Sequence, residues 1–122
     1  MNLNDLKGKV VLLTFWFPGC GPCRGEFPHF QAVINEYKVQ DVVYIGINVA
    51  PEQNEYVLPF MKNTKYSFIP LRGTDSVMND YKVQGEPTNF LIDKDGKIAY
   101  SDFSINANNQ RTLELMISSL LN

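Results

Sequence analysis

Residues 9–23 read KVVLLTFWFPGCGPC, a segment that joins an apolar run to two closely spaced cysteines. The run from Lys9 to Phe17 is rich in β-branched and aromatic residues, which is typical of a central strand buried on both faces. Cys20 and Cys23 follow at once, and the chain contains no other cysteine. The segment therefore predicts a buried strand that ends beside a cysteine pair.

The residues that follow predict a βαβ unit. Residues 41–49 repeat the apolar, β-branched pattern of the first strand. Between the two strands, residues 23–38 carry apolar side chains at three- and four-residue spacing, the period of one helical face. Two strands joined by a helix pair in parallel. The apolar side chains of the predicted helix are Phe27, Phe30, Val33, Ile34 and Tyr37.

The second half of the chain predicts further helices and a hairpin. A helix is expected at about 53–65 and a short one at about 76–81. Residues 88–93 and 97–101 read as antiparallel strands joined through Asp95-Gly96. A closing helix follows, with Asn108 or Asn109 as its N-cap. The expected inner stripes are Tyr56, Val57, Phe60 and Met61, and then Leu113, Met116, Ile117, Leu120 and Leu121. The expected fold class is therefore α/β, with a central mixed β-sheet flanked by helices on both faces.

Bulk composition limits the possible partners. The 122 residues fit a single domain, 1–122, and carry a formal net charge of -2 without a basic patch, so we expect no nucleic-acid partner. The longest apolar run is far shorter than the ~20 residues that span a bilayer, so this segment predicts no membrane contact. We also expect a monomer.

The position of the cysteines predicts redox chemistry. At the first turn of a helix, residues three apart lie about 5 to 6 Å from each other, which suits a disulfide. A thiolate at a helix N-terminus is stabilised, so we expect the pKa of Cys20 to fall from ~8.5 to between ~3.5 and ~7.5 and Cys20 to be the nucleophile. Cys23, one turn inside, would resolve the mixed disulfide. Pro22 suits the first helical position, and Gly21 leaves room for a substrate backbone.

Two other uses of the cysteine pair have less support in the sequence. A tetrahedral zinc site needs four ligands, and the chain adds only His29 to the two cysteines. A purely structural disulfide across a four-residue loop would constrain the unfolded chain rather little.

Several motifs together resemble thioredoxins and, more closely, the TlpA/ResA-like thiol-disulfide oxidoreductases. They are Phe15-Trp16, Cys20-Gly21-Pro22-Cys23, residues 24–28 (RGEFP), residues 85–93 (GEPTNFLID) and residues 95–97 (DGK). The resemblance covers essentially the whole chain. It implies a thioredoxin-like fold, with protein thiols and disulfides as substrates and an upstream electron donor. No metal or organic cofactor is implied.

The resemblance also assigns supporting residues. Pro87 should be the cis-proline that lies against the cysteine pair, and a proline at the start of a strand is compatible with that place. Trp16, at the end of the first strand, is expected to pack beneath the cysteine loop, with contact to substrate as the alternative. Pro28 matches the internal proline of the family's first helix, where it bends the helix.

Three departures from thioredoxins stand out. Thr14 occupies the position, six residues before Cys20, where many thioredoxins carry a buried aspartate that assists proton transfer. Glu52, after the second strand, and Glu86, beside Pro87, are the candidates to replace it, although solvation is the commoner fate of a glutamate. Gly19 stands where a tryptophan is usual, which should widen the approach to Cys20.

The resemblance implies a specialised bacterial reductant that works outside the cytoplasm, and a chain of which these residues are one part. Oxidation or isomerisation of client thiols is the same chemistry at another redox potential. A thiol peroxidase is a rival enzyme, but its usual Thr or Ser three residues before the cysteine is here Phe17. A non-catalytic binding module is the rival from another class.

Overall fold

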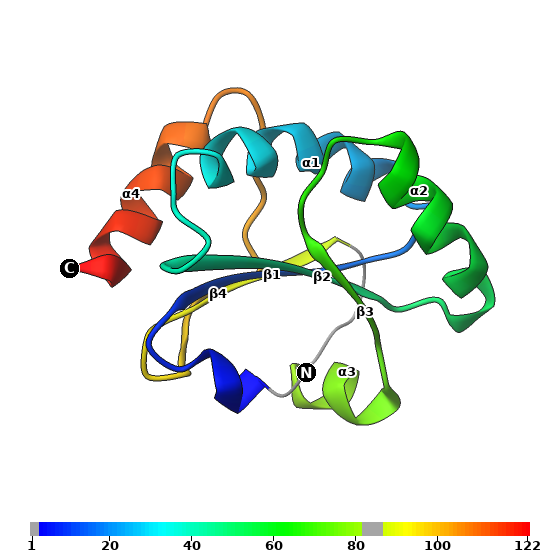
Figure 1. Ribbon diagram of the computed structural model, residues 1–122, viewed down its shortest axis with the longest axis horizontal. Coiled ribbons are helices and arrows are strands. Elements are labelled where there is room, and N and C mark those ends of the chain that lie inside the picture. Colours follow the sequence, from blue (N-terminus) through cyan, green and yellow to red (C-terminus); the bar gives the residue numbers. More distant parts are fainter. Residues whose placement is uncertain (1–2, 82–86) are drawn as a thin grey trace.

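The computed structural model describes residues 3–81 and 87–122 as a five-stranded sheet between layers of helices (Figure 1). The strands are β1 (Val10–Trp16), β2 (Val42–Asn48), β3 (Ile69–Arg72), β4 (Thr88–Ile92) and β5 (Ile98–Ser101). The α-helices are α1 (Gly21–Ile34), α2 (Val57–Asn63), α3 (Asp75–Asp80) and α4 (Gln110–Leu121). Two short 3-10 helices complete the elements, η1 (Leu3–Leu6) and η2 (Pro51–Tyr56).

β1 lies at the centre of the sheet. The strand order is β3-β2-β1-β4-β5. β1 pairs in parallel with β2, and β2 in parallel with β3, whereas β4 runs antiparallel to both β1 and β5. Every residue of β1 is buried, because the strand has a neighbour on each edge and a layer on each face. The predicted buried strand and the βαβ unit are confirmed.

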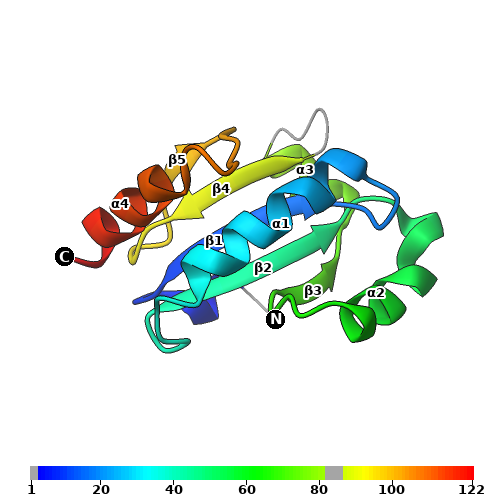
Figure 2. The ribbon, with the colours of Figure 1, turned by 90° about the horizontal axis from the view of Figure 1, so that it is seen from above.

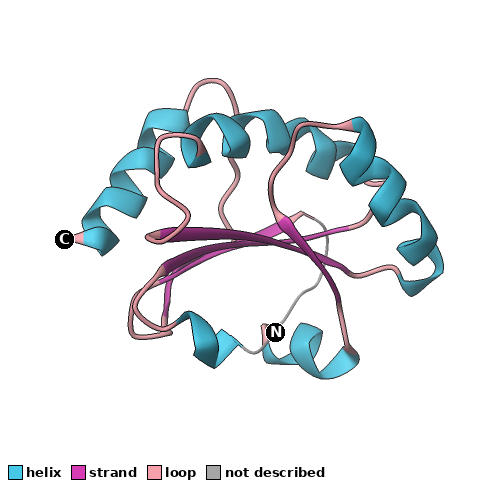
Figure 3. Ribbon diagram, in the orientation of Figure 1, coloured by secondary structure: helices cyan, strands magenta, loops and turns pink. Residues whose placement is uncertain are grey.

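Helices cover both faces of the sheet, as predicted. α1, α2 and α4 lie on one face, and α3 and η1 lie on the other (Figures 1 and 3). Seen from above, α1 crosses β1 and β2, α4 lies toward β4 and β5, and α2 lies outside β3 (Figure 2). This is the expected mixed sheet with helices on both faces.

The core consists of two apolar clusters that share β1. Alternate side chains of this strand point to opposite faces, so Leu12 and Trp16 belong to the cluster under α1 while Leu13 and Phe15 belong to the other. The cluster under α1 is strongly aromatic. The ring centroid of Trp16 lies 5.3 Å from that of Phe27 and 5.2 Å from that of Phe68. These aromatic contacts form a rigid base below the start of α1.

One glycine of β2 makes this aromatic packing possible. A Cβ atom on Gly46 would lie 2.5 Å from a ring carbon of Phe68 and 3.1 Å from Nε1 of Trp16. Neither ring can withdraw, because Trp16 and Phe68 are both buried. Gly46 is therefore required by close packing rather than by backbone conformation.

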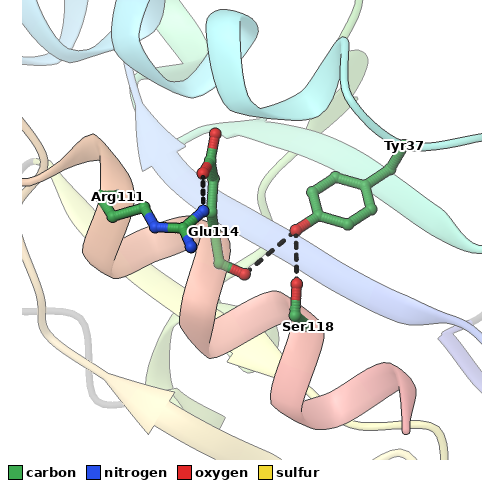
Figure 4. A network of polar contacts seen from close by, with 4 residues as sticks. All are labelled: Tyr37, Arg111, Glu114 and Ser118. Carbon is green, nitrogen blue, oxygen red and sulfur yellow. Dashed lines mark hydrogen bonds and ion pairs between the residues drawn. The ribbon is translucent and has the colours of Figure 1, made fainter.

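Polar contacts hold α4 against the chain that follows α1 (Figure 4). The hydroxyl of Tyr37 donates to the carbonyl oxygen of Glu114 at 3.0 Å, and it lies 3.0 Å from the hydroxyl oxygen of Ser118. Arg111 forms an ion pair with the side chain of Glu114 at 2.9 Å. Leu113 and Ile117 are buried beneath this network, which confirms the predicted apolar stripe of the closing helix.

Two predicted helices differ from those observed. The first ends at Ile34 rather than near residue 38. The second, predicted at 53–65, is observed as η2 followed by α2. Val57 packs against the core, but Tyr56 is 56% exposed, so its place on the inner stripe was wrong. A 3-10 helix has three residues per turn, and the α-helical period therefore does not extend back through η2.

The sequence did not predict β3. Its residues Ile69 to Arg72 include Pro70, which argues against a central strand. β3 pairs with β2 alone, and an edge strand tolerates proline because one of its sides needs no ladder donors. The predicted hairpin is confirmed, with Gly96 at a φ of 84° in its turn. Asn109 is the N-cap residue of α4, although its side chain bonds Asn106 and Ser104 rather than α4.

Candidate active site

The cysteine pair lies where β1 passes into α1. β1 ends at Trp16, and α1 begins at Gly21 with Cys20 as its N-cap. Cys20 and Cys23 form a disulfide, with their Cα atoms 5.3 Å apart. The spacing expected from the sequence is confirmed. Pro22 occupies the second rather than the first helical position, where its missing N–H still costs no intrahelical bond.

Backbone geometry fixes Cys20 at the start of the helix. Its Sγ accepts a hydrogen bond from the N–H of Cys23 at 3.2 Å, and its carbonyl oxygen accepts one from the N–H of Arg24 at 3.1 Å. Cys20 thus supplies the side-chain cap of a 14-residue helix. The N–H of Cys23 and the positive end of the helix dipole both lie at this sulfur, and both favour a thiolate over a thiol.

The two cysteines differ in exposure as predicted. Cys20 is 4% exposed, whereas Cys23 is fully buried. Gly21 and Pro22 are exposed, and a Cβ atom on Gly21 would meet nothing within 4 Å. The loop between the cysteines is therefore open to solvent, and Cys20 is the less covered of the two sulfur-bearing residues.

Trp16 supports the loop from below. It is fully buried and contacts the rings of Phe27, Phe60 and Phe68, so the packing role expected from the sequence fits its place. Its Nε1 has no hydrogen-bond partner among the described residues. The indole separates the cysteine loop from the sheet without reaching solvent.

Gly19 and Gln53 connect the cysteine loop to η2. The N–H of Gly19 donates to Oε1 of Gln53 at 2.8 Å. A Cβ atom on Gly19 would lie 3.1 Å from the same oxygen. The amide of Gln53 thus lies close to the place that a side chain at residue 19 would begin to fill, and η2 contacts the active-site loop through this residue.

Pro87 lies at the same end of the sheet as the cysteines. Thr88 begins β4 and pairs with Phe15, the penultimate residue of β1, so Pro87 extends β4 toward the cysteine loop. Pro87 is half-buried. Its cis peptide bond stays a prediction, because the bond begins at Glu86, which lies outside the described residues, as does the expected role of Glu86 itself.

Glu52 lies on the outer side of η2. It is exposed and lines a surface hollow with Pro51, Glu55 and Arg72. Its neighbour Gln53, not Glu52, contacts the cysteine loop. No described contact therefore brings Glu52, the carboxylate predicted from the sequence, to the cysteines.

Glu26 is a buried carboxyl group on α1, three residues after Cys23, and its role was not predicted from the sequence. Its two oxygens accept hydrogen bonds from the side chain of Asn89 at 3.0 Å and from the N–H of Ile105 at 2.8 Å. Burial raises its pKa, while these hydrogen bonds and the charge of His29 lower it in part. The signal in the sequence was its helical phase, because Cys23, Glu26 and Phe30 share one face.

Polar side chains continue from Glu26 into the sheet. Asn89 lies opposite Thr14 in the register of β4 and β1. The hydroxyl of Thr14 is buried, and neither it nor Oδ1 of Asn89 has a hydrogen-bond partner among the described residues. The position that carries an aspartate in many thioredoxins is thus occupied by a neutral side chain, and the nearby ionisable group on α1 is Glu26.

The side chain of His29 lies between α1 and α4, since its Nδ1 lies 2.5 Å from Oε1 of Gln110 on α4.

The described residues contain no group of three or more side chains able to hold a metal ion. Within those same ranges, no helix has the length and apolar character needed to cross a membrane.

The chain is similar in sequence to known proteins. The profile of the AhpC/TSA family matches residues 1–101. The thiol-disulfide oxidoreductase ResA of Bacillus subtilis is 39% identical over 99 residues, 80% of this chain and 55% of ResA, so the chain spans about half the length of the curated relatives it matches.

Two solved structures share the fold over the full chain and 86% of their own length. A candidate thiol:disulfide interchange protein DsbE from Chlorobium tepidum is 28% identical with a TM-score of 0.87. The thioredoxin domain of a thiol-disulfide oxidoreductase from Bacteroides vulgatus is 26% identical with a TM-score of 0.78. The expected thioredoxin-like fold is therefore confirmed.

Proposed function

This chain belongs to the AhpC/TSA family, and on that premise we propose that it is a thiol-disulfide oxidoreductase that exchanges electrons with protein disulfides through Cys20 and Cys23. One observation carries the proposal: a closed disulfide at the N-terminus of α1, in which Cys20 is 4% exposed and Cys23 is fully buried. The names of the curated relatives agree with it.

The reaction proceeds in two exchanges. The Cys20 thiolate attacks one sulfur of a client disulfide, a Cys20–client disulfide forms, and the other client sulfur leaves as a thiolate that takes up a proton. Cys23 then loses its proton and attacks Sγ of Cys20, which releases the second client thiol and closes the disulfide between Cys20 and Cys23. Two electrons pass from this protein to the client; Cys23 gives up one proton, and the other comes from the solvent, to which Cys20 lost its own proton when it ionised.

The second exchange needs a proton acceptor, and we assign that part to Glu26. Residues three apart on a helix are neighbours, so Glu26 lies one turn from Cys23 on the same face. Its raised pKa moves it toward the range in which a carboxylate accepts a proton from a thiol at neutral pH. Glu52 and Glu86, the candidates from the sequence, remain alternatives as the proton acceptor, and replacing each of the three by glutamine would distinguish them.

In vivo we propose that the protein is a reductant of client disulfides outside the cytoplasm, reduced in turn by an upstream donor and acting as a monomer without a metal or organic cofactor. The resemblance to the TlpA/ResA-like proteins supports this direction and place. Oxidation or isomerisation of client thiols is the alternative, since potentials in this fold range from ~-270 to ~-120 mV.

The deciding experiment measures the reduction potential of the Cys20/Cys23 couple against glutathione, together with reduction of insulin disulfides. A potential near or below ~-220 mV with insulin reduction supports a reductant, and one near ~-120 mV makes the protein an oxidant. A pair that does not equilibrate with glutathione would leave only a binding module.

A further inference from the structure

A hollow of about 360 Å³ lies directly beside the cysteine loop. Pro18 and Gly19 form its rim on the side of Cys20, and Arg24 of α1 stands at another point of the rim. Tyr56, Pro59 and Phe60 supply most of its apolar wall. Figures 1 and 2 both show α2 and the N-terminal end of α1 at the same end of the molecule.

The wall presents aromatic surface to solvent. Tyr56 is 56% exposed, and Phe60 is half-buried with its inner side against the rings of Trp16 and Phe27. Contiguous exposed apolar surface with polar residues at its rim is typical of interaction sites, and here the rim includes Arg24 and Asn63. Because Phe60 is anchored in the core, this surface is preformed.

Arg24 adds an unpaired positive charge to the same hollow. It follows Cys23 directly, is exposed, and places its guanidinium carbon 5.7 Å from the ring centroid of Phe60. Among the described residues, the single ion pair is that between Arg111 and Glu114. Arg24 therefore has no carboxylate partner among these residues. A guanidinium held over an aromatic ring is preorganised to receive an acidic side chain.

The absence of a side chain at residue 19 joins the hollow to the redox site. Gly19 lies next to Cys20 and is exposed, and the side-chain amide of Gln53 contacts its backbone N–H. The chain that leaves a reacting client cysteine can therefore pass over Gly19 into the hollow. At about 360 Å³ the hollow is near the lower end of ligand pockets, which run from ~300 to ~1,000 Å³, and so suits one or two side chains of a polypeptide.

We propose that this hollow is the docking site for the client segment that flanks the reacting cysteine, and that it selects an aromatic or large aliphatic side chain together with a nearby carboxylate. The apolar side chain packs on Tyr56 and Phe60, and the carboxylate pairs with Arg24. This proposal rests on the proposed exchange at Cys20. The occupant is an acidic, aromatic stretch of a client protein, and the hollow determines which client disulfides react fastest.

The test uses reduced protein and synthetic peptides whose cysteine carries 5-thio-2-nitrobenzoate, the better leaving group, so that release of the coloured thiolate reports attack on the peptide sulfur. The peptides are Asp-Phe-Cys-Phe-Asp, Lys-Phe-Cys-Phe-Lys and Asp-Ala-Cys-Ala-Asp, symmetric so that either chain direction is served. N-acetylcysteine amide with the same leaving group is the reference. The readout is the ratio of each peptide's rate constant to the reference, which cancels changes in Cys20 itself.

We expect the native protein to prefer the acidic aromatic peptide over the lysine peptide and over the alanine peptide by about fivefold each, the scale of one solvated charge pair or one partly buried ring. Arg24→Gln should abolish the preference over the lysine peptide, and Tyr56→Ala the preference over the alanine peptide. The matched controls Arg72→Gln, on β3, and Tyr100→Ala, on β5, should keep both preferences.

Equal ratios for all three peptides with the native protein would overturn the docking proposal, as would preferences that survive in Arg24→Gln and Tyr56→Ala. If the native protein releases no thiolate from the reference probe either, the proposed exchange itself fails. The two failures are therefore distinguishable within one set of measurements.

Discussion

The side-chain amide of Asn89 donates a hydrogen bond of 3.0 Å to Glu26, and so joins the start of β4 to α1 inside the protein. The same amide nitrogen also donates to the carbonyl oxygen of Phe103 at 2.8 Å. Glu26 is thereby fixed in the helix turn that follows Cys23. Because this carboxyl group is buried and held in place, it should affect both the rate of the exchange at Cys23 and the pH dependence of stability.

Replacing the carboxyl group should slow the release of the client. In Glu26→Gln, we expect the resolution of a Cys20–client disulfide by Cys23 to slow by about 100-fold at neutral pH, the low end of general-base contributions, because Cys23 loses its proton acceptor. Rapid-quench analysis of the mixed disulfide measures this step. Glu52→Gln and Glu86→Gln are the comparisons, and a slow step in either of them with normal resolution in Glu26→Gln would move the role away from Glu26.

The raised pKa of Glu26 also predicts how stability depends on pH. Burial, the largest cause, favours the protonated form in the folded protein, so the folded state binds this proton more tightly than the unfolded state does. The native protein should therefore gain stability relative to Glu26→Gln as pH falls through the folded pKa toward 4.5, and lose that gain as pH rises. Urea unfolding of both proteins at pH 7 and pH 5 checks the sign, and a pH-independent difference contradicts it.

Removing the resolving sulfur should trap the client. In Cys23→Ser, Cys20 can still attack a disulfide, but the mixed disulfide has no internal thiol to resolve it. We expect this variant to form a covalent adduct with insulin whose disulfides have been reduced and re-formed. The adduct should survive denaturing electrophoresis and disappear on treatment with dithiothreitol. Cys20→Ser should give none, because Cys23 is fully buried; adducts of equal yield in both variants would reverse the assigned order of attack.

Two glycine substitutions should have opposite effects on stability. Gly46→Ala forces a methyl group to 2.5 Å from Phe68 in a rigid aromatic cluster, and we expect a loss of about 1 to 3 kcal/mol in the free energy of unfolding. Gly25→Ala lies on α1 with nothing within 4 Å of the added Cβ atom, and should gain about 0.5 to 1 kcal/mol from helix propensity. Chemical denaturation measures both.

Loss of one hydroxyl should loosen the last helix. Tyr37→Phe removes the hydrogen bonds to Glu114 and Ser118 shown in Figure 4, and we expect a cost of about 0.5 to 1.5 kcal/mol in unfolding free energy. Hydrogen exchange should be faster in α4 than in β1 relative to the native protein. Arg111→Gln, which breaks only an exposed ion pair, is the matched control and should cost less.

The sequence predicted the elements whose residues carry strong local patterns. β1 and β2 are continuous apolar runs, and α1 and α4 have clear helical stripes, so these elements and the site at the end of β1 followed directly. Pro70 hid β3, because only its pairing to β2 at the edge of the sheet makes a proline acceptable. The exposure of Tyr56 depends on a change from 3-10 to α geometry that residue spacing does not encode.

The supporting residues of the site were harder to predict than the cysteines. Glu52 was chosen for its place in the sequence after β2, but the distance that matters is across the fold, and there Gln53 makes the contact. Glu26 was available from helical phase alone, yet its burial depends on hydrogen bonds from Asn89 and from Ile105, which is 79 residues away along the chain. A hydrogen-bonded carboxyl group can be buried where an unpaired one could not, and sequence spacing does not reveal such partners.

Cys20 would combine two tasks, since the sulfur that we propose as the nucleophile is also the atom that caps α1. An anionic sulfur is a stronger acceptor for the N–H of Cys23 than a sulfur in a disulfide. Each catalytic turn should therefore tighten and relax the first turn of α1 in step with the oxidation state, without any larger motion of the fold. An amide proton at the start of this helix would therefore report whether the cysteine pair is reduced or oxidised.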